Sequence, residues 1–349
     1  MRALVITKHG PPEVLRVEER PDPTPGPGEV RVAVRAAGIN FADTSARMGI
    51  YPDAPKPPCV VGYEFAGEVE SLGEGAEGVA VGDRVMGGCR FGAYAELVVT
   101  GAGNLIPLPD GWSFEEGAAL PVVYSTASAG LIRYGALRPG ERMLIQAAAG
   151  GVGTAATQIA KLVGAGEIYG TASASKHDAI RGFGVDHPID YTAGDFADEV
   201  RRIAGEEKPL DLVMDAVGGK SLKRSWSLLR PGGRLVGFGF SAASTGERRN
   251  VLKAARAVAQ MPRFWSVPMM SESKSFIGLN MLRLWDAKGS LDEFIDPLRD
   301  WLEAGKLRPV VSEAFPLERG AEAHRFIQDR KNVGKVVHTL KSAQAGRRP

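Results

Sequence analysis

A glycine-rich turn gives the sequence its clearest chemical signal. The stretch LIQAAAGGVGTAATQIAK, residues 144–161, places Gly150, Gly151, Val152 and Gly153 between an apolar run and an amphipathic one. Small residues let the backbone approach a pyrophosphate, and a helix that begins near Val152 offers it free N–H groups and a partial positive charge. The pattern predicts a dinucleotide phosphate site. The alternative is a tight structural turn in an α/β domain that holds another ligand.

The end of the next strand-like run indicates which dinucleotide binds. NAD sites usually place Asp or Glu there, about 20 residues after the glycines, to bind the ribose 2′-hydroxyl. This chain has Ser173 at that distance and Lys176 just beyond, whereas Asp178 already belongs to the following helix. Hydroxyls and a cation suit a 2′-phosphate, which a carboxylate would repel. We therefore expect NADPH; alternatively, Ser175 caps the helix and Lys176 is solvated.

The types and spacing of the histidines and cysteines do not suggest a metal site. A catalytic zinc ion needs about three protein ligands. The chain has 5 His, widely scattered, and 2 Cys, and Cys59 and Cys89 have no partner at CxxC spacing. We expect no metal. Two free thiols without a disulfide framework are typical of a reducing cytosol, so a cytoplasmic location is expected.

The elements that must position these residues fall into two groups. The first third has short strands such as EVRVAVRAAGIN and EFAGEVESLG, typical of a barrel-like or sandwich core. From about residue 124, apolar runs alternate with helical patterns, which predicts a doubly wound parallel sheet. The six predicted strands cover residues 142–149, 167–173, 187–191, 210–217, 233–239 and 275–280.

The C-terminal part of the chain is predicted to return to the first domain. It reads as one helix over 291–307, a strand, a second helix and a closing strand. We expect a β-rich catalytic domain from residues 1–123 and 283–349, and a dinucleotide domain over 124–282 with an insert at 241–274. Residues 341–349 look like a polar tail.

Composition excludes several classes of function. The chain has 43 basic and 41 acidic residues, a formal net charge of +2, which gives no electrostatic footprint for nucleic acid. No run of about 18 apolar residues suggests a membrane span. The start, MRALVITKHGPPEV, lacks the features of a signal peptide.

Several motifs together give the sequence a family resemblance. They are AAGINFADTSARMGIYP, GYEFAGEVESLGEG, VGDRVMG, GAYAELVV, AAAGGVGTAATQIAK and KNVGKVV. The chain resembles the zinc-independent quinone oxidoreductases of the medium-chain dehydrogenase/reductase superfamily. Within it, GTASASKHDAI and DRKNVGKVV are most similar to the VAT-1 homologues. The resemblance implies a GroES-like fold for the β-rich domain. Zinc enzymes of the superfamily carry Cys where this chain has Ala37 or Gly38, and His where it has Tyr63.

A metal-free nicotinamide reductase is chemically reasonable for this chain. A quinone or an α,β-unsaturated carbonyl accepts hydride at an electrophilic carbon, so the enzyme needs mainly positioning, a dry site and hydrogen-bond donors. The resemblance implies that Asn40 contacts the cofactor, and that Asp43 and Tyr51 line the substrate side. Tyr51 and Tyr63 are candidate O–H donors to the substrate oxygen. The structural alternatives are that Asn40 closes a turn, Asp43 caps a helix and Tyr51 packs before a proline.

The resemblance also implies further cofactor contacts, beyond the glycine turn, Ser173 and Lys176. These are Thr126, Tyr191, Gly218, Phe238, Ser241, Phe276, Gly278 and Arg330. Most of them follow the carboxyl ends of predicted strands, where such sheets bind ligands. For the apolar and aromatic members, packing in the core is the alternative, and for Arg330 it is a solvated helix end.

The insert and the last strand of the sheet suggest partners. Within 245–270, Val251, Ala254, Ala255, Val258 and Ala259 form an apolar helical stripe; its basic residues are Arg248, Arg249, Lys253, Arg256 and Arg263. We expect a lid or dimer-edge helix here, with 264–265 and 269–270 walling the cavity, in preference to contact with an anionic membrane surface. The run KSFIGLN reads as an edge strand, which predicts a homodimer.

Two other functions stay open from the sequence. The VAT-1 resemblance permits a binding or membrane-associated organising protein that keeps the nucleotide fold but turns over little. Within the enzymes, a 2-alkenal or enoyl-thioester reductase is the nearest rival to a quinone reductase.

Overall fold

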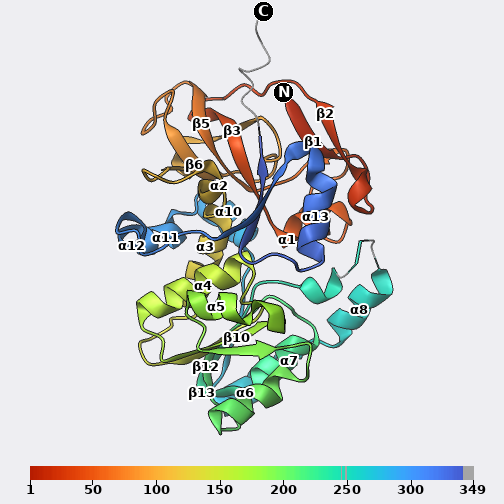
Figure 1. Ribbon diagram of the computed structural model, residues 1–349, viewed down its shortest axis with the longest axis vertical. Coiled ribbons are helices and arrows are strands. Elements are labelled where there is room, and N and C mark those ends of the chain that lie inside the picture. Colours follow the sequence, from red (N-terminus) through yellow and green to blue (C-terminus); the bar gives the residue numbers. More distant parts are fainter. Residues whose placement is uncertain (245, 248–249, 341–349) are drawn as a thin grey trace, which may run out of the picture.

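The computed structural model describes residues 1–244, 246–247 and 250–340 (Figure 1). A β-rich part forms the upper half of the view, and an α/β part with a parallel sheet forms the lower half. The expected fold class is therefore confirmed. Arg248 and Arg249 of the insert and the expected polar tail lie outside the described residues.

The parallel sheet has six strands in the order β11-β10-β9-β12-β13-β14, and all its pairings are parallel. The chain builds outward from β9 in one direction and then restarts on its other side, which is the doubly wound arrangement. The six strands predicted from the sequence all form. They are β9 (Arg142–Ile145), β10 (Glu167–Ala172), β11 (His187–Asp190), β12 (Leu210–Asp215), β13 (Leu229–Gly237) and β14 (Ser275–Gly278).

Alternating side chains of the central strands enter two different cores. Met143 and Ile145 of β9 belong to one cluster of buried residues, whereas Leu144 between them belongs to another. Helices therefore cover both faces of this sheet. The first cluster includes residues of α3 (Pro121–Ser128), α4 (Gly151–Val163), α5 (His177–Phe183) and α11 (Asp292–Ile295), and the second includes residues of α6 (Phe196–Ala204) and α7 (Lys220–Ser227).

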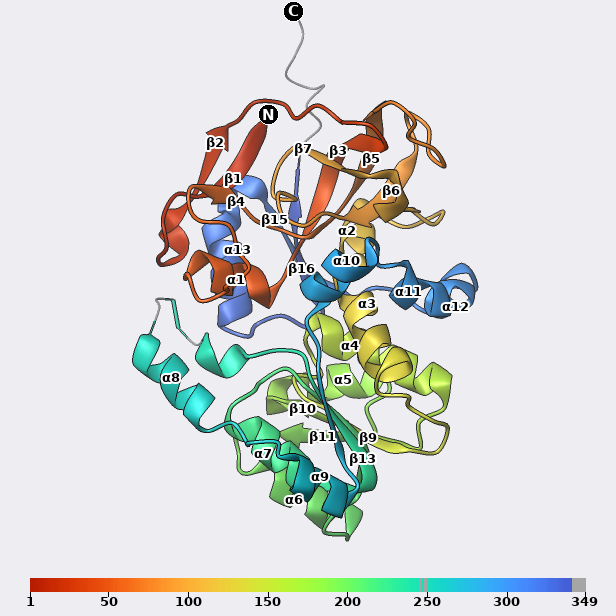
Figure 2. The ribbon, with the colours of Figure 1, turned by 180° about the vertical axis from the view of Figure 1, so that it is seen from behind.

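The β-rich part contains a seven-stranded sheet and a three-stranded sheet. In the larger sheet β16 pairs with β3, so strands from both ends of the chain share it (Figure 2). The larger sheet consists of β3 (Glu29–Ile39), β5 (Glu64–Leu72), β6 (Arg84–Gly88), β7 (Leu97–Gly101), β8 (Leu105–Pro107), β15 (Val311–Pro316) and β16 (Lys335–Thr339). The smaller one consists of β1 (Arg2–Ile6), β2 (Leu15–Glu19) and β4 (Cys59–Val60). Beside them lie α1 (Phe41–Arg47), α2 (Phe114–Ala118) and α13 (Gly320–Gln328).

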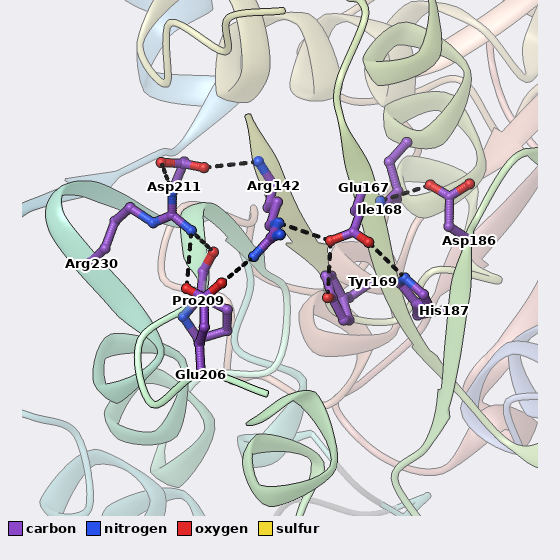
Figure 3. A network of polar contacts seen from close by, with 10 residues as sticks. All are labelled: Arg142, Glu167, Ile168, Tyr169, Asp186, His187, Glu206, Pro209, Asp211 and Arg230. Atoms are coloured by element: carbon purple, nitrogen blue, oxygen red, sulfur yellow. Dashed lines mark hydrogen bonds and ion pairs between the residues drawn. The ribbon is translucent and has the colours of Figure 1, made fainter. Parts of the chain in front are cut away.

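Charged side chains hold together the amino-terminal edge of the parallel sheet (Figure 3). Arg142, the first residue of β9, pairs with Glu167 at the start of β10 at 2.8 Å and with Glu206 at 2.8 Å. Its backbone N–H donates to Asp211 of β12, and Arg230 of β13 lies 3.6 Å from the same carboxylate. This network lies at the edge opposite the strand ends that bind ligands in such sheets, so we assign it to stability.

The insert corrects one expectation. Its helices are α8 (Val251–Ala259) and α9 (Ser266–Glu272). The aromatic and methionine side chains at 264–265 and 269–270 do not wall the cavity: Trp265 is 64% and Met270 69% exposed. The ring of Phe264 stacks instead on Phe276 of β14, with centroids 4.1 Å apart. Val251 and Val258 of the predicted stripe are likewise exposed.

A second correction concerns the region expected to be one helix over 291–307. The chain forms α11 and α12 (Arg299–Glu303), separated by a short 3₁₀ turn at Asp296–Leu298. Pro297 lies in that turn. A proline inside a helix removes a backbone hydrogen bond and clashes with the preceding turn, so the helix is interrupted there. The preceding helix, α10 (Met281–Lys288), lies against the β-rich part.

The last strand of the parallel sheet, β14, pairs on one side only among the described strands. This is the edge that the expected homodimer would use; the dimer itself stays a prediction. Within residues 1–244, 246–247 and 250–340, no helix combines the length and hydrophobicity of a membrane span.

The return of the chain to the β-rich sheet makes a glycine at position 334 necessary. Gly334 has φ +93°, and an added Cβ would lie 2.3 Å from the carbonyl oxygen of Val310. Gly305 has φ +66° but open space around it. We predict that Gly305→Ala lowers the free energy of unfolding by about 1 kcal/mol, from backbone strain alone. Gly334→Ala should lower the free energy of unfolding by at least about 2 kcal/mol more than Gly305→Ala does, because its Cβ would also clash with the backbone. Denaturant unfolding of both variants would measure this, and equal losses would contradict the geometry.

Candidate active site

One large cavity, of about 1030 Å³, lies between the two parts of the chain. Residues that follow the carboxyl ends of the parallel strands line one side, from Ala147 after β9 to Gly278 at the end of β14. Asn40, Tyr51 and Tyr63 of the β-rich part line the other. This is where doubly wound sheets bind nucleotides.

The glycine turn forms the floor of the cavity. Gly150 precedes α4, a helix of 13 residues that starts at Gly151. A Cβ at Gly153 would lie 2.4 Å from the carbonyl oxygen of Ala147, so only glycine fits between the turn and the strand. The N–H of Gly334 donates to the carbonyl of Ala149 at 2.8 Å, which ties the C-terminal part of the chain to this turn. The free N–H groups of α4 thus face a space walled by both domains.

Basic side chains dominate the charge of the cavity. Among the described residues that line it, five are basic and none is acidic; the basic ones are Lys176, Lys220, Arg224, Arg330 and Lys335. The ammonium of Lys176 donates to the backbone carbonyls of Arg330 at 2.5 Å and Asn332 at 2.6 Å. Burial and the charge of Arg330 lower the pKa of Lys176. The Arg330 guanidinium lies over the ring of Tyr191, 5.6 Å from its centroid. Arg224 and Lys335 are paired with acids that do not line the cavity, Asp195 at 2.9 Å and Glu64 at 2.5 Å, so it is Lys176, Lys220 and Arg330 that favour a negatively charged ligand.

Two buried polar atoms in the cavity wall, Oγ of Ser125 and Nε2 of Gln146, have no hydrogen-bond partner among the described residues. The hydroxyl of Tyr63 is also buried and interacts with that of Tyr51. The Oε1 of Gln146 accepts from Thr171 at 2.7 Å, which orients the amide and leaves Nε2 available. Buried polar groups are rarely left unpaired, so these atoms indicate where a ligand binds. The sequence analysis missed Ser125 and Gln146, because neither belongs to the glycine turn itself.

Part of the cavity lining is aromatic. Tyr51, Tyr63 and Trp285 line it, together with Met281 and Leu282 of α10. Burial raises the pKa of Tyr63 well above its ordinary range, and burial also raises the pKa of Tyr51. Both phenols are therefore neutral and can donate a hydrogen bond to a substrate oxygen.

A buried carboxylate joins the β-rich part to the start of α3 beside this region. Glu64, the first residue of β5, is fully buried, and Lys335 places its ammonium 2.5 Å from Oε1. The amide of Asn40 donates to the same Oε1 at 2.9 Å and accepts from Lys335 at 2.5 Å. The other oxygen, Oε2, accepts from the backbone N–H of Val122 in the first turn of α3 at 2.7 Å. Neither Glu64 nor Lys335 was among the site residues predicted from the sequence.

The structure brings most of the predicted site residues together. The cavity is lined by Asn40, Tyr51, Tyr63, Thr126, Gly150, Gly151, Val152, Gly153, Ser173, Lys176, Tyr191, Gly218, Phe238, Ser241, Gly278 and Arg330. Asp43 and Phe276 are not among the lining residues. Phe276 packs against Phe264 instead, because its side chain points from β14 toward the insert.

Asp43 is buried behind the cavity wall and contacts Asn40, which lines the cavity. Its Oδ2 accepts from the backbone N–H of Asn40 at 2.7 Å and from the hydroxyl of Tyr94 at 2.7 Å. It forms a capping box with Asn40 at the start of α1. The structure thus favours the capping interpretation of Asp43. Burial raises its pKa to about 6.

The start of the insert bridges the two domains beside the cavity. The hydroxyls of Ser244 and Ser45 of α1 lie 2.9 Å apart and are buried. The carbonyl of Gly246 accepts from Gln328 of α13 at 2.7 Å. Ala257 of α8 lines the cavity. The insert therefore closes one flank of the cavity through its first residues, although its aromatic residues lie elsewhere.

The described residues contain no group of three or more His, Cys, Asp or Glu side chains placed to hold a metal ion. Tyr63 and Cys89 lie near Glu64, but Cys89 is buried and burial raises the pKa of its thiol far above the ordinary value. The residues present do not fit a catalytic zinc ion, which needs about three ligands.

Comparisons with known proteins place this fold and site in a family. The model of the family described as "Zinc-binding dehydrogenase" matches residues 183–337, and that of "Alcohol dehydrogenase GroES-like domain" matches residues 26–110. The synaptic vesicle membrane protein VAT-1 homolog of Danio rerio is 38% identical over 339 residues, covering 97% of this chain and 70% of the relative. The human VAT-1 homolog is 37% identical, covering 97% and 86%.

Solved structures agree with these relatives. The CurK enoyl reductase has a TM-score of 0.84 at 28% identity, covering 97% of this chain and 99% of that one. A mycobacterial protein complexed with NADPH has a TM-score of 0.83 at 30% identity, covering 97% and 100%. The quinone oxidoreductase from Coxiella burnetii has a TM-score of 0.78 at 28% identity, covering 98% and 99%.

The chain therefore belongs to the medium-chain dehydrogenase/reductase superfamily of oxidoreductases. Within that superfamily its sequence is similar to the VAT-1 homologues, and its structure is similar to quinone oxidoreductases and enoyl reductases. The expected resemblance and the GroES-like nature of the β-rich domain are confirmed.

The raised pKa of Asp43 predicts a specific pH dependence of stability. Its pKa of about 6 in the folded chain exceeds the ordinary value of 3.8, so the folded state binds this proton more tightly. The fold should gain stability from this group as the pH falls through 6 toward 4, and lose that gain as the pH rises. Two pKa units correspond to about 3 kcal/mol. Asp43→Asn should remove this component, which denaturant unfolding of both proteins between pH 4 and 7 would show. Parallel pH profiles would contradict the assignment.

Proposed function

We propose that this chain is an NADPH-dependent reductase that passes a hydride to a quinone or an α,β-unsaturated carbonyl without a metal ion. The observation that carries the proposal is the composition of the cavity. Its described lining has five basic side chains and no acidic one, and buried polar atoms without partners lie in the same wall. A phosphorylated dinucleotide would neutralise the cations, and a carbonyl substrate would accept from the neutral phenols.

The residues of the cavity fit the expected cofactor. Gly150 to Gly153 and the start of α4 would hold the pyrophosphate. Ser173, Lys176 and Arg330 lie on the lining beyond the end of β10 and would hold the 2′-phosphate. Lys176 uses two of its three donors on backbone carbonyls, so one remains for a ligand. When bound, the reduced nicotinamide supplies the hydride. The similar mycobacterial structure with NADPH supports this choice.

The proposed reduction needs one proton as well as the hydride. The hydride forms a bond to the electrophilic carbon, the π electrons move to the oxygen, and the oxygen then takes a proton. The enol formed from an enone tautomerises to the saturated ketone, and the product formed from a quinone tautomerises to the hydroquinone. Tyr63 is the favoured hydrogen-bond donor to the substrate oxygen, since its hydroxyl is buried, neutral and part of the cavity wall, and the proton itself comes from solvent. Tyr51 and Trp285 would flank a planar substrate. A conjugated acceptor needs no Lewis acid, which agrees with the absence of a fitting zinc site among the described residues.

Turnover of NADPH tests this proposal. The purified protein, treated with a chelator, should oxidise NADPH in the presence of an ortho-quinone or a 2-alkenal, as seen by loss of nicotinamide absorbance. Tyr63→Phe should lower kcat by about 10²-fold, because a hydrogen-bond donor to the developing oxyanion is lost. Phe91 packs on the Tyr63 ring with centroids 5.1 Å apart, so Phe91→Leu is a control for packing alone. Turnover that requires added zinc, or none with any acceptor, would contradict the proposal.

Cofactor preference can be tested at the 2′-phosphate site. Lys176→Glu should weaken NADPH binding by about 10- to 100-fold, the value of a charge-assisted hydrogen bond, while NADH binding changes little. Lys331→Glu is the control: Lys331 pairs with Asp329 at 3.0 Å and does not line the cavity. Titration of both reduced cofactors by nicotinamide fluorescence would measure this. Equal losses for NADPH and NADH would refute the assignment.

Two other functions have some support from the comparisons. The likeness to CurK, an enoyl reductase, favours reduction of an enoyl thioester as the second candidate. The similarity to the VAT-1 homologues keeps open an organising protein that binds the nucleotide with little turnover. An enoyl thioester reduced far faster than any quinone would select the first. Tight NADPH binding without oxidation by any acceptor would select the second.

A further inference from the structure

We propose that Glu64 is a positioning residue for the reduction, which acts through the side-chain amide of Asn40. The inference deepens the proposed function and depends on it for its kinetic part. It starts from the carboxylate that joins the β-rich part to α3, whose oxygens accept from Asn40, Lys335 and the first turn of α3.

The contacts of Glu64 fix which way the Asn40 amide faces. The amide donates from Nδ2 to the carboxylate and accepts at Oδ1 from the ammonium of Lys335. A flipped amide would place its NH₂ against the ammonium and its oxygen against the carboxylate, so both contacts would become repulsive. One N–H of Nδ2 is used by Glu64, and the other remains available on the wall of the cavity.

The backbone of Asn40 is held independently of this contact. Asp43 accepts from its N–H through the capping box of α1. The main chain should therefore stay in place when the side-chain contacts change, so a change at Glu64 should act on the orientation of the Asn40 amide and on the ammonium of Lys335 that both contact. Gly38 leaves room for this arrangement, because a Cβ there would lie 2.6 Å from Cγ of Glu64.

Glu64 also links the amide to the cofactor side of the cavity. Val122, which donates to Oε2, lies in α3, and Ser125 and Thr126 of the same helix line the cavity. Lys335 lines it too, close to Gly151 of the glycine turn. One carboxylate thus sets the position of Asn40 relative to groups that would hold the cofactor. Small errors of position near a reacting group lower rates by about 10²-fold.

Glu64→Gln tests the proposal, since it removes the charge but keeps the shape. We expect kcat to fall by about 10- to 100-fold, while the Kd for NADPH changes by less than about 3-fold. The isotope effect on kcat, measured with NADPH that carries deuterium at C4 of the nicotinamide, should rise because hydride transfer becomes slower than the other steps. The matched control is Glu141→Gln. Glu141 pairs with Arg234 at 2.6 Å at the far edge of the sheet, so this variant should lose stability and keep its kcat.

A double-mutant cycle with Asn40→Ala separates positioning from a merely structural role. If Glu64 acts through the amide, Glu64→Gln should lower kcat by less than about 2-fold in the Asn40→Ala background. Full additivity of the two losses would overturn the inference, and so would a Glu64→Gln variant with the kcat of the original protein.

The emission spectrum of bound NADPH provides a readout that does not need turnover. It reports the surroundings of the nicotinamide, so Glu64→Gln should shift it, and Asn40→Ala should abolish any further shift. If the original protein binds NADPH but reduces no acceptor, the proposed function fails while this shift still tests the role of Glu64. An unchanged spectrum in Glu64→Gln would contradict that role.

Discussion

The structure depends on one buried ion pair, Lys335 with Glu64, at the junction of its two domains. Both charges are almost fully withdrawn from water, which is costly unless each is paired and hydrogen-bonded. The carboxylate meets this condition with three donors, Asn40, Lys335 and the N–H of Val122 at the start of α3, which come from distant parts of the chain. The pair is expensive to bury, so its retention beside the cavity is more easily explained by positioning than by stability.

The cavity has two regions that differ in charge and in hydrogen-bonding groups. Cations and helix α4 gather around the strand ends of the parallel sheet, where phosphates would bind. Neutral phenols and an indole line the other end, where a conjugated carbonyl would bind. The two ends come from different domains, because Asn40, Tyr51 and Tyr63 belong to the β-rich part and the glycine turn to the other. The cleft between the domains is thus the smallest unit that could carry out the reaction.

The sequence was most informative where the physical rule is local. The glycine turn was predictable because strand, turn and helix are consecutive, and the six parallel strands because each apolar run stands between helical patterns. The contact of Lys335 with Asn40 joins residues 295 positions apart, and no local pattern announces it. The prediction that the insert walls the cavity with its aromatic and methionine residues was wrong for a related reason. An apolar stripe shows that a helix is amphipathic but not which side meets the protein, and Val251 and Val258 face outward here.

Individual residues show the same division between local and distant effects. Asp43 was expected at the substrate, yet its capping box was also readable from its place three residues after Asn40. The break between α11 and α12 follows from Pro297, which the helical periodicity of 291–307 hid. Ser125 and Gln146 became candidates only when burial showed that their polar atoms lack partners among the described residues.

The most direct test of the central claim follows the hydride itself. The protein would be incubated with a cyclic enone in two separate reactions, in which NADPH carries deuterium at one face of the nicotinamide C4 or at the other. The product of each reaction would be analysed by mass spectrometry and NMR. The account predicts that one of the two labelled faces gives a saturated ketone with a single deuterium at the β-carbon. A product without deuterium from either face, or no saturated ketone at all, would contradict it.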